Sequence, residues 1–193
     1  MNNNIENYLT LTQKYSILLL NANNNEPITG KIWFQKELFL ISENIPRLAD
    51  ETEFEEDLIG PLSINAAAEL EHLQVEQLVE LNGKIRLTQK GLEVARRLEL
   101  RASPETKAII LDMKSFLNDL SQDELLGFIY FTYPKMVTES IKFEEIKSKR
   151  GEIAVSLYRK RKVSIGKAAQ IAGLSQEDFI RKAQANNVTV FSE

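Results

Sequence analysis

The chain has 193 residues, a length that suits one large domain or two small ones. Hydrophobic residues make up 43% and charged residues 27%, an ordinary balance that excludes collagen-like and fully disordered chains. The sequence has no cysteine, which excludes disulfides, thiolate zinc sites, iron–sulfur clusters and cysteine nucleophiles. His72 is the only histidine, so any site that needs two imidazoles is excluded as well.

The net charge of −4 is divided unevenly along the chain. Residues 1–141 hold 13 basic and 22 acidic residues, whereas residues 142–193 hold 11 basic and 6 acidic residues. The first part therefore has a net charge of −9 and the second a net charge of +5. This division favours an anionic partner for the C-terminal segment. A solvated basic face without a partner is the alternative.

No apolar run approaches the length that a membrane span needs. The longest, residues 15–20, is far short of the roughly 20 residues required. The first residues, Met1 to Glu6, lack the positive region of a secretory signal peptide. We therefore expect a cytoplasmic protein that makes no membrane contact.

Apolar residues at helical spacing predict the first two helices. One runs over residues 5–20 and ends in the helix-breaking cluster 21–27. In the other, apolar residues recur every three or four positions over 34–45, and Pro46 closes the helix. The acidic stretch 50–57 lacks the spacing of a calcium-binding loop, and we expect a solvated loop there. The alternative is that it competes with nucleic acid for the basic C-terminal segment.

The next elements predict a hairpin between two helices. Ser63 is a good N-cap for a third helix, which reaches about Gln77. Strands 78–81 and 84–87 then flank the pair Asn82-Gly83, which favours a type I′ turn, and a fourth helix follows. The order helix, helix, helix, hairpin, helix is that of a winged-helix domain, with the third helix as recognition element and the hairpin as wing.

This predicted winged-helix half is a weak candidate for reading DNA. If its apolar residues face the core, the exposed side of the third helix carries Asn65, Glu69, His72 and Glu76. The two carboxylates would repel the phosphate backbone, and only Lys84 and Arg86 on the wing point towards phosphate. We therefore favour a protein-interaction or dimerisation platform for this half. His72 has no matching ligand cluster and is interpreted as an exposed polar residue.

Two cap motifs mark the helices of the middle segment. Ser103 precedes a proline and an acid at the start of one helix. Ser121 and Glu124 form a capping box for the next, whose residues 125–133 are apolar nearly all round. This apolar helix is explained equally well by burial inside the monomer and by a homodimer contact. Thr138 is expected to cap a further helix that ends near Ser148.

The C-terminal segment contains the pattern of a helix-turn-helix. After a helix over residues 151–160, Ala169 and Gly173 have the spacing at which two helices approach and turn. Leu174 is expected to fill the corner, Ser175 to cap the second helix and Phe179 to pack inward. The outer face of the second helix then carries Gln176, Glu177, Arg181, Lys182 and Gln184. Residues 188–191 are consistent with a short strand.

Two clusters of cations, residues 147–150 and 159–162, adjoin this motif and suit phosphate neutralisation. The predicted DNA-binding residues are Lys84, Arg86, Arg159, Lys160, Arg161, Lys162, Lys167, Gln176, Arg181 and Lys182. No phosphate loop, nucleophile elbow or acid–base pair is present, so we expect neither an enzyme nor a metal or other cofactor. The expected domains are a winged helix (1–101), a helical connector (102–148) and a helix-turn-helix (149–193).

Two stretches resemble known prokaryotic families. Ile28-Thr29-Gly30-Lys31, Gly60-Pro61-Leu62-Ser63 and Leu87-Thr88-Gln89-Lys90-Gly91 mark residues 28–91 as similar to winged-helix regulators and Panacea-type antitoxin-like proteins. Ser164-Ile165-Gly166-Lys167-Ala168-Ala169 and Ala172-Gly173-Leu174-Ser175 lie in residues 150–191, which resemble a small, poorly characterised family proposed as antitoxins.

The sequence thus leads to two functional hypotheses. The first is a non-enzymatic transcriptional regulator that contacts double-stranded DNA through its basic C-terminal helix-turn-helix. The second is an adaptor or antitoxin-like protein whose winged-helix half binds a protein partner.

Overall fold

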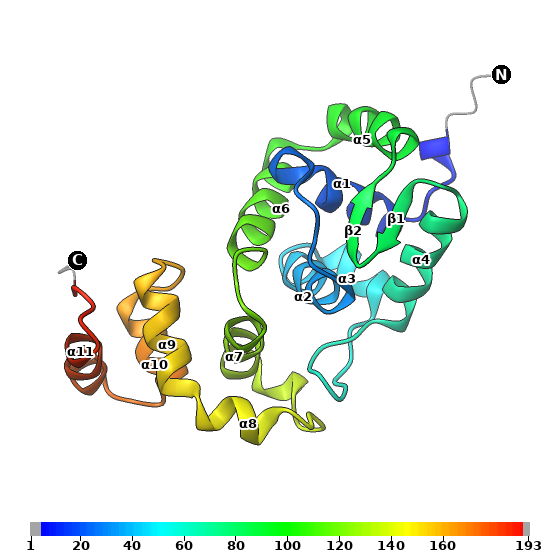
Figure 1. Cartoon of the computed structure of the whole chain (residues 1–193). Coiled ribbons are helices and arrows are strands. Elements are labelled where there is room, and N and C mark those ends of the chain that lie inside the picture. Colours follow the sequence, from blue (N-terminus) through cyan, green and yellow to red (C-terminus); the bar gives the residue numbers. More distant parts are fainter. Residues whose placement is uncertain (1–4, 191–193) are drawn as a thin grey trace. The chain divides into compact units, whose positions relative to one another are not determined.

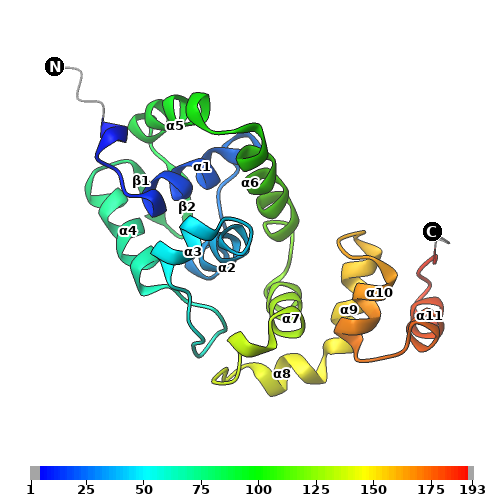
Figure 2. The same ribbon diagram turned by 180° about the vertical axis from the view of Figure 1, so that it is seen from behind.

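The chain is mainly helical. The computed structural model describes residues 5–190, and helices make up 67% of it. Eleven α-helices and one two-stranded antiparallel sheet lie among the described residues (Figures 1 and 2). A mainly helical protein with one small hairpin is thus confirmed.

The contacts divide the chain into two compact units. The first unit comprises Met1–Glu55 and Pro61–Asp119, and the second comprises Glu56–Gly60 and Leu120–Glu193. The stretch 102–148, expected as a connector, contributes its first helix to the first unit and its later helices to the second.

The first helix begins later than predicted. A 3₁₀ turn, η1 (Ile5–Asn7), precedes α1 (Leu11–Asn25). Thr10 caps α1, since its hydroxyl accepts a hydrogen bond from the Gln13 amide while the Gln13 side chain accepts one from the Thr10 amide. An N-cap at this position interrupts any helix that starts at η1, so the predicted helix over 5–20 is wrong at its N-terminal end.

Helix α2 (Lys31–Ser42) follows, with Trp33, the only tryptophan of the chain, half-buried against the core. Pro46 was predicted to close this helix, but it starts another, α3 (Pro46–Thr52). Proline is suited to the first helical turn, where an N–H would have no intrahelical partner. Because α3 includes residues 50–52, the prediction of a loop over 50–57 is wrong for these three residues, whereas residues 53–57 lie in no helix.

The third predicted helix and the hairpin are present. Ser63 caps α4 (Ile64–Val75), and β1 (Val79–Asn82) pairs antiparallel with β2 (Lys84–Leu87). A type I′ turn needs positive φ at both central residues. Only Gly83 has it, at +75°, and the asparagine before it is the last residue of β1. The type I′ prediction is therefore wrong, although the hairpin lies where it was expected.

Helices α5 (Gln89–Arg101) and α6 (Pro104–Leu117) complete the first unit. The caps predicted for them, Thr88 and Ser103, each accept a hydrogen bond from a backbone amide of the first turn. Helix α1 packs against α4, α5, α6 and β2, and the buried apolar residues of these elements form one core.

The second unit begins with α7 (Gln122–Thr132), whose predicted capping box is confirmed. Its side chains Leu125, Leu126, Ile129 and Tyr130 are buried in the single chain. A 3₁₀ turn, η2 (Pro134–Met136), and α8 (Phe143–Ser148) follow. The prediction that Thr138 caps α8 is wrong. The Thr138 hydroxyl donates to the Glu56 carboxylate instead, and α8 has no side-chain cap.

The last three helices are α9 (Arg150–Arg159), α10 (Ile165–Ala172) and α11 (Gln176–Ala185). The predicted strand over 188–191 is wrong for residues 188–190, which have no regular structure, and Phe191 lies outside the described residues.

Candidate nucleic-acid interface

Helices α10 and α11 are joined by a tight turn at Gly173. This glycine has φ of +69° and its amide donates back to the carbonyls of Ala169 and Gln170, which ends α10. The Ser175 hydroxyl then accepts a hydrogen bond from the Asp178 amide at 3.1 Å and starts α11. The turn and the cap predicted from the sequence are therefore both present.

Helix α11 is anchored along one side only. Phe179 and Ala183, one helical turn apart, are fully buried, and the Phe179 ring contacts the Tyr158 ring edge-on at 5.7 Å between centroids. Leu174 is 39% exposed, so the prediction that it fills the corner is wrong. The side of α11 opposite to its anchor is open to solvent.

The exposed residues of α11 include amides and a guanidinium, and also the two carboxylates of Glu177 and Asp178. Gln176, Arg181 and Gln184 are exposed, as predicted. The Arg181 guanidinium contacts the Asp178 carboxylate at 2.6 Å, an exposed pair one turn apart. Lys182 is half-buried, and its stem lies where a side chain on Gly151 would be.

Arg150, from the first predicted cation cluster, has a structural role. Its Nε donates to the Ile171 carbonyl at 2.7 Å and its Nη2 to the Gln170 carbonyl at 3.1 Å, at the C-terminal end of α10. Its guanidinium also lies 4.3 Å from the ring centroid of Phe131. Burial lowers the pKa of this group. The arginine therefore binds the end of one helix and is not directed at solvent.

The Glu124 carboxylate binds Lys160, one of the cations of the second cluster. This carboxylate accepts hydrogen bonds from the Lys160 ammonium at 2.8 Å and the Ser156 hydroxyl at 2.6 Å. Burial by itself would raise the pKa of Glu124, but these hydrogen bonds lower it by more, so the pKa of Glu124 lies below its usual value. Arg159 likewise binds the carbonyl of Asn186 at 3.1 Å.

The remaining predicted cations of the second unit differ in exposure. Arg161 is exposed, with φ of +57°, whereas Lys162 is half-buried. Lys167 is half-buried too; its ammonium lies 5.8 Å from the Phe128 ring centroid, and burial lowers its pKa. Lys149, in the first cluster, contacts two carboxylates at 3.0 Å. Intramolecular partners thus hold a large share of the basic charge.

The two residues predicted to lie on a wing, Lys84 and Arg86, belong to the first unit. Lys84 and Arg86 are exposed while Ile85 between them is buried, as the alternating pattern predicted. Arg86 pairs across the hairpin with the Glu80 carboxylate at 3.2 Å.

On α4 the predicted exposed face is present, and it is acidic. Asn65, His72 and Glu76 are exposed, and Glu69 is half-buried. The His72 ring contacts Glu69 at 3.4 Å. No group of three potential metal ligands occurs among the described residues.

Sequence reasoning missed the structural roles of Arg150 and Glu124. Both interact with residues 20 or more positions away, and no local pattern marks such contacts. The capping box identified Glu124, but only as a partner of Ser121.

The comparisons with known proteins give one family match. Residues 128–192, about a third of the chain, match the model of an uncharacterised protein family (UPF0175). This region overlaps the C-terminal stretch whose sequence resembles a poorly characterised family. The comparisons with curated proteins and with solved structures found no match. None of the helices in residues 5–190 is both long and apolar enough to cross a membrane.

Proposed function

We propose that this protein is a DNA-binding regulator whose helices α10 and α11 act as a helix-turn-helix on double-stranded DNA. The observation that carries the proposal is the one-sided anchoring of α11. Phe179 and Ala183 fix the helix, and the opposite side exposes Arg181 and Gln184, together with the Glu177 carboxylate. Glutamine amides can bond base edges bidentately, and arginine can bond guanine or phosphate. A recognition helix in the major groove needs such an open polar face.

The charge of this region supports the same proposal. Residues 142–193 have a net charge of +5. The Arg181–Asp178 ion pair is exposed, and such pairs contribute only about 0–1 kcal/mol, so a phosphate can replace the carboxylate at low cost. Arg159, Arg161 and Lys182 lie on the same three-helix segment and add sequence-independent attraction.

The test is a salt titration of duplex binding by fluorescence anisotropy with the full chain. Replacing Arg181 and Lys182 by alanine should weaken binding and reduce the slope of log affinity against log salt by up to about 2, since each phosphate contact contributes about 0.9. The matched control replaces Lys142, just before α8, and Lys147, on α8, which form exposed ion pairs with carboxylates of that helix. It removes the same charge but should alter the slope less.

Two outcomes contradict the proposal. One is the absence of duplex binding by the wild-type chain at low salt. The other is an equal loss of affinity in the α11 variant and in the α8 control, because general charge and not the open face of α11 would then account for binding.

A second candidate function concerns the first unit. We propose that α1, α2, α4, the hairpin β1–β2 and α5 form a winged helix, with α3 as an additional helix, and that it serves as a protein-interaction or antitoxin-like platform. The acidic exposed face of α4 and the Arg86–Glu80 pair on the wing favour a protein over DNA. A pull-down with wild-type bait should recover a stoichiometric protein that Glu76→Lys bait loses. Recovery of nucleic acid alone, by both baits, would contradict this function.

A further inference from the structure

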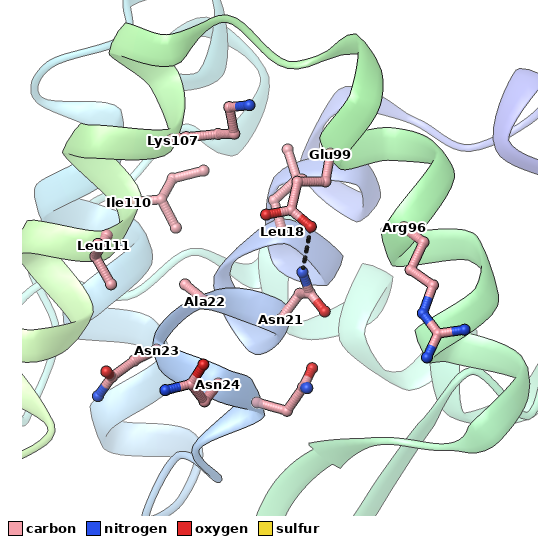
Figure 3. A pocket seen from close by; sticks show the side chains of 11 residues that line it. Leu18, Asn21, Ala22, Asn23, Asn24, Arg96, Glu99, Lys107, Ile110 and Leu111 are labelled. Atoms are coloured by element: carbon pink, nitrogen blue, oxygen red, sulfur yellow. Dashed lines mark hydrogen bonds between the residues drawn. The ribbon is translucent and has the colours of Figure 1, made fainter.

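The first unit contains a hollow between α1, α5 and α6 that the DNA-binding proposal does not use. Its volume is about 540 Å³ (Figure 3). Its apolar lining consists of Leu18 and Ala22 from α1 and of Ile110 and Leu111 from α6. The volume lies within the range of about 300–1,000 Å³ that is usual for sites of small organic molecules. The rest of the lining is polar, which suits a polar or charged ligand.

Two cationic side chains at this hollow, Arg96 and Lys107, can interact with a ligand. Figure 3 shows Arg96 on α5 and Lys107 on α6 at opposite sides, with Glu99 and Asn21 between them. The Glu99 carboxylate accepts a hydrogen bond from the Asn21 amide at 3.2 Å. Within residues 5–190, neither Arg96 nor Lys107 has a side-chain hydrogen bond or ion pair to the protein. Two cations therefore face one carboxylate, and the rim favours an anion.

An unusual backbone segment forms another wall of the hollow. The consecutive residues Asn23, Asn24 and Asn25 all have positive φ, between 50° and 59°. This left-handed conformation is unfavourable for L-residues, although asparagine tolerates it better than most. Strained backbone of this kind persists where the surrounding structure holds it, and it gathers at ligand-binding positions. The Asn23 amide donates to the Glu26 carboxylate at 2.5 Å, and the exposed amides of Asn24 and Asn25 can both donate and accept hydrogen bonds.

A buried lysine holds this segment in place. The Lys114 side chain is fully buried, and its ammonium donates to the carbonyls of Leu20 at 3.0 Å and Ala22 at 2.8 Å. The Glu26 amide also donates to the Asn23 carbonyl at 3.1 Å. The asparagine wall is therefore preformed, which reduces the conformational entropy that a ligand would lose on binding.

We propose that this hollow binds a small organic anion. Its apolar body would contact Leu18, Ile110 and Leu111, and its carboxylate or phosphate group would bind Arg96 or Lys107. The asparagine amides would bond polar atoms of the body.

The proposal can be tested by isothermal titration and ¹⁵N–¹H NMR of the full chain. The probes are naphthalene-2-carboxylate, adenosine monophosphate, the neutral naphthalene-2-carboxamide and inorganic phosphate. We expect at least one of the two organic anions to bind with a Kd of about 1 mM or tighter, a value suited to a probe of a dozen or more heavy atoms. The side-chain amide resonances of Asn21, Asn23, Asn24 and Asn25 should shift. The neutral amide and free phosphate should bind at least about tenfold more weakly.

Variants distinguish this site from general attraction to a cation. Arg96→Gln or Lys107→Gln should weaken binding of the organic anion by about tenfold. The matched control, Arg47→Gln, removes an exposed arginine of α3 outside the hollow and should leave the Kd unchanged. Preference for the carboxylate or for the nucleotide identifies the anionic group. The proposal is overturned if neither organic anion binds, or if both hollow variants bind like the control. Neither result depends on whether the chain binds DNA.

Discussion

Replacement of Arg150 by methionine should destabilise the second unit. The arginine makes hydrogen bonds to the carbonyls of Ile171 and Gln170 and lies on the face of the Phe131 ring. A hydrogen bond to a charged group contributes about 1.5–3 kcal/mol and a partly exposed cation–π contact about 0.5–1 kcal/mol. One of the two hydrogen bonds is exposed and the group is partly desolvated, so we expect a loss of about 2–4 kcal/mol.

The assay is urea unfolding followed by two signals. Tryptophan fluorescence reports the first unit, which contains Trp33, whereas circular dichroism at 222 nm reports helices of both. With a slope of about 1 kcal/mol per molar urea, the circular-dichroism transition of the second unit should move by roughly 2–4 M. The fluorescence transition should stay in place. Arg150→Lys should recover only part of the loss. A lysine keeps the positive charge, but its ammonium lacks the planar fork that reaches two carbonyls.

The matched control is Lys147→Met. This lysine pairs on the surface with Glu144, one turn away, and such pairs contribute about 0.3–0.5 kcal/mol. Equal stability of Arg150→Met and this control would refute the structural role. If Arg150→Met also reduced the salt slope of DNA binding, the arginine would instead be a phosphate contact.

Two further predictions concern the first unit. A Cβ on Gly91 would lie 2.0 Å from the Leu78 carbonyl oxygen, so Gly91→Ala should destabilise the first unit by about 3 kcal/mol or more. Gly83 has open space around it but a positive φ, so Gly83→Ala should cost only about 1–2 kcal/mol. Both losses can be measured by urea unfolding monitored by tryptophan fluorescence. Comparable losses in the two variants would contradict this clash. Burial lowers the pKa of Lys114 to about 8 from 10.5. Between these values the unfolded chain keeps a proton that the folded protein releases, so the free energy of unfolding should rise with pH. The Lys114→Met variant should lose this increase of the free energy of unfolding with pH, and the exposed control Lys107→Met should keep it. An increase retained in both variants would show that another group causes it.

The start and end of helices could be predicted because their signals are local. Ser63, Thr88, Ser121 and Ser175 each bond an amide three residues along the chain, and nothing remote is needed to form such a cap. The same locality explains the hairpin at Gly83 and the left-handed turn at Gly173. Local signals fail where two interpretations compete. A proline can end one helix or begin another, and the sequence pattern did not show that Pro46 only begins α3, four residues after α2 has ended at Ser42.

The charges show what the sequence alone determined and what the tertiary structure decided. The sequence determined that basic residues gather in the C-terminal segment, since a count needs no fold. Only the tertiary structure decided that Arg150 binds the end of α10, that Lys160 binds Glu124, and that Arg181 lies on an open helix face. The same holds for Lys114, which the apolar stripe of its helix did not mark as buried. The physical reason is that a charged side chain acts on whatever lies within a few ångströms, and in this fold those neighbours are often 20 to 94 residues away in sequence.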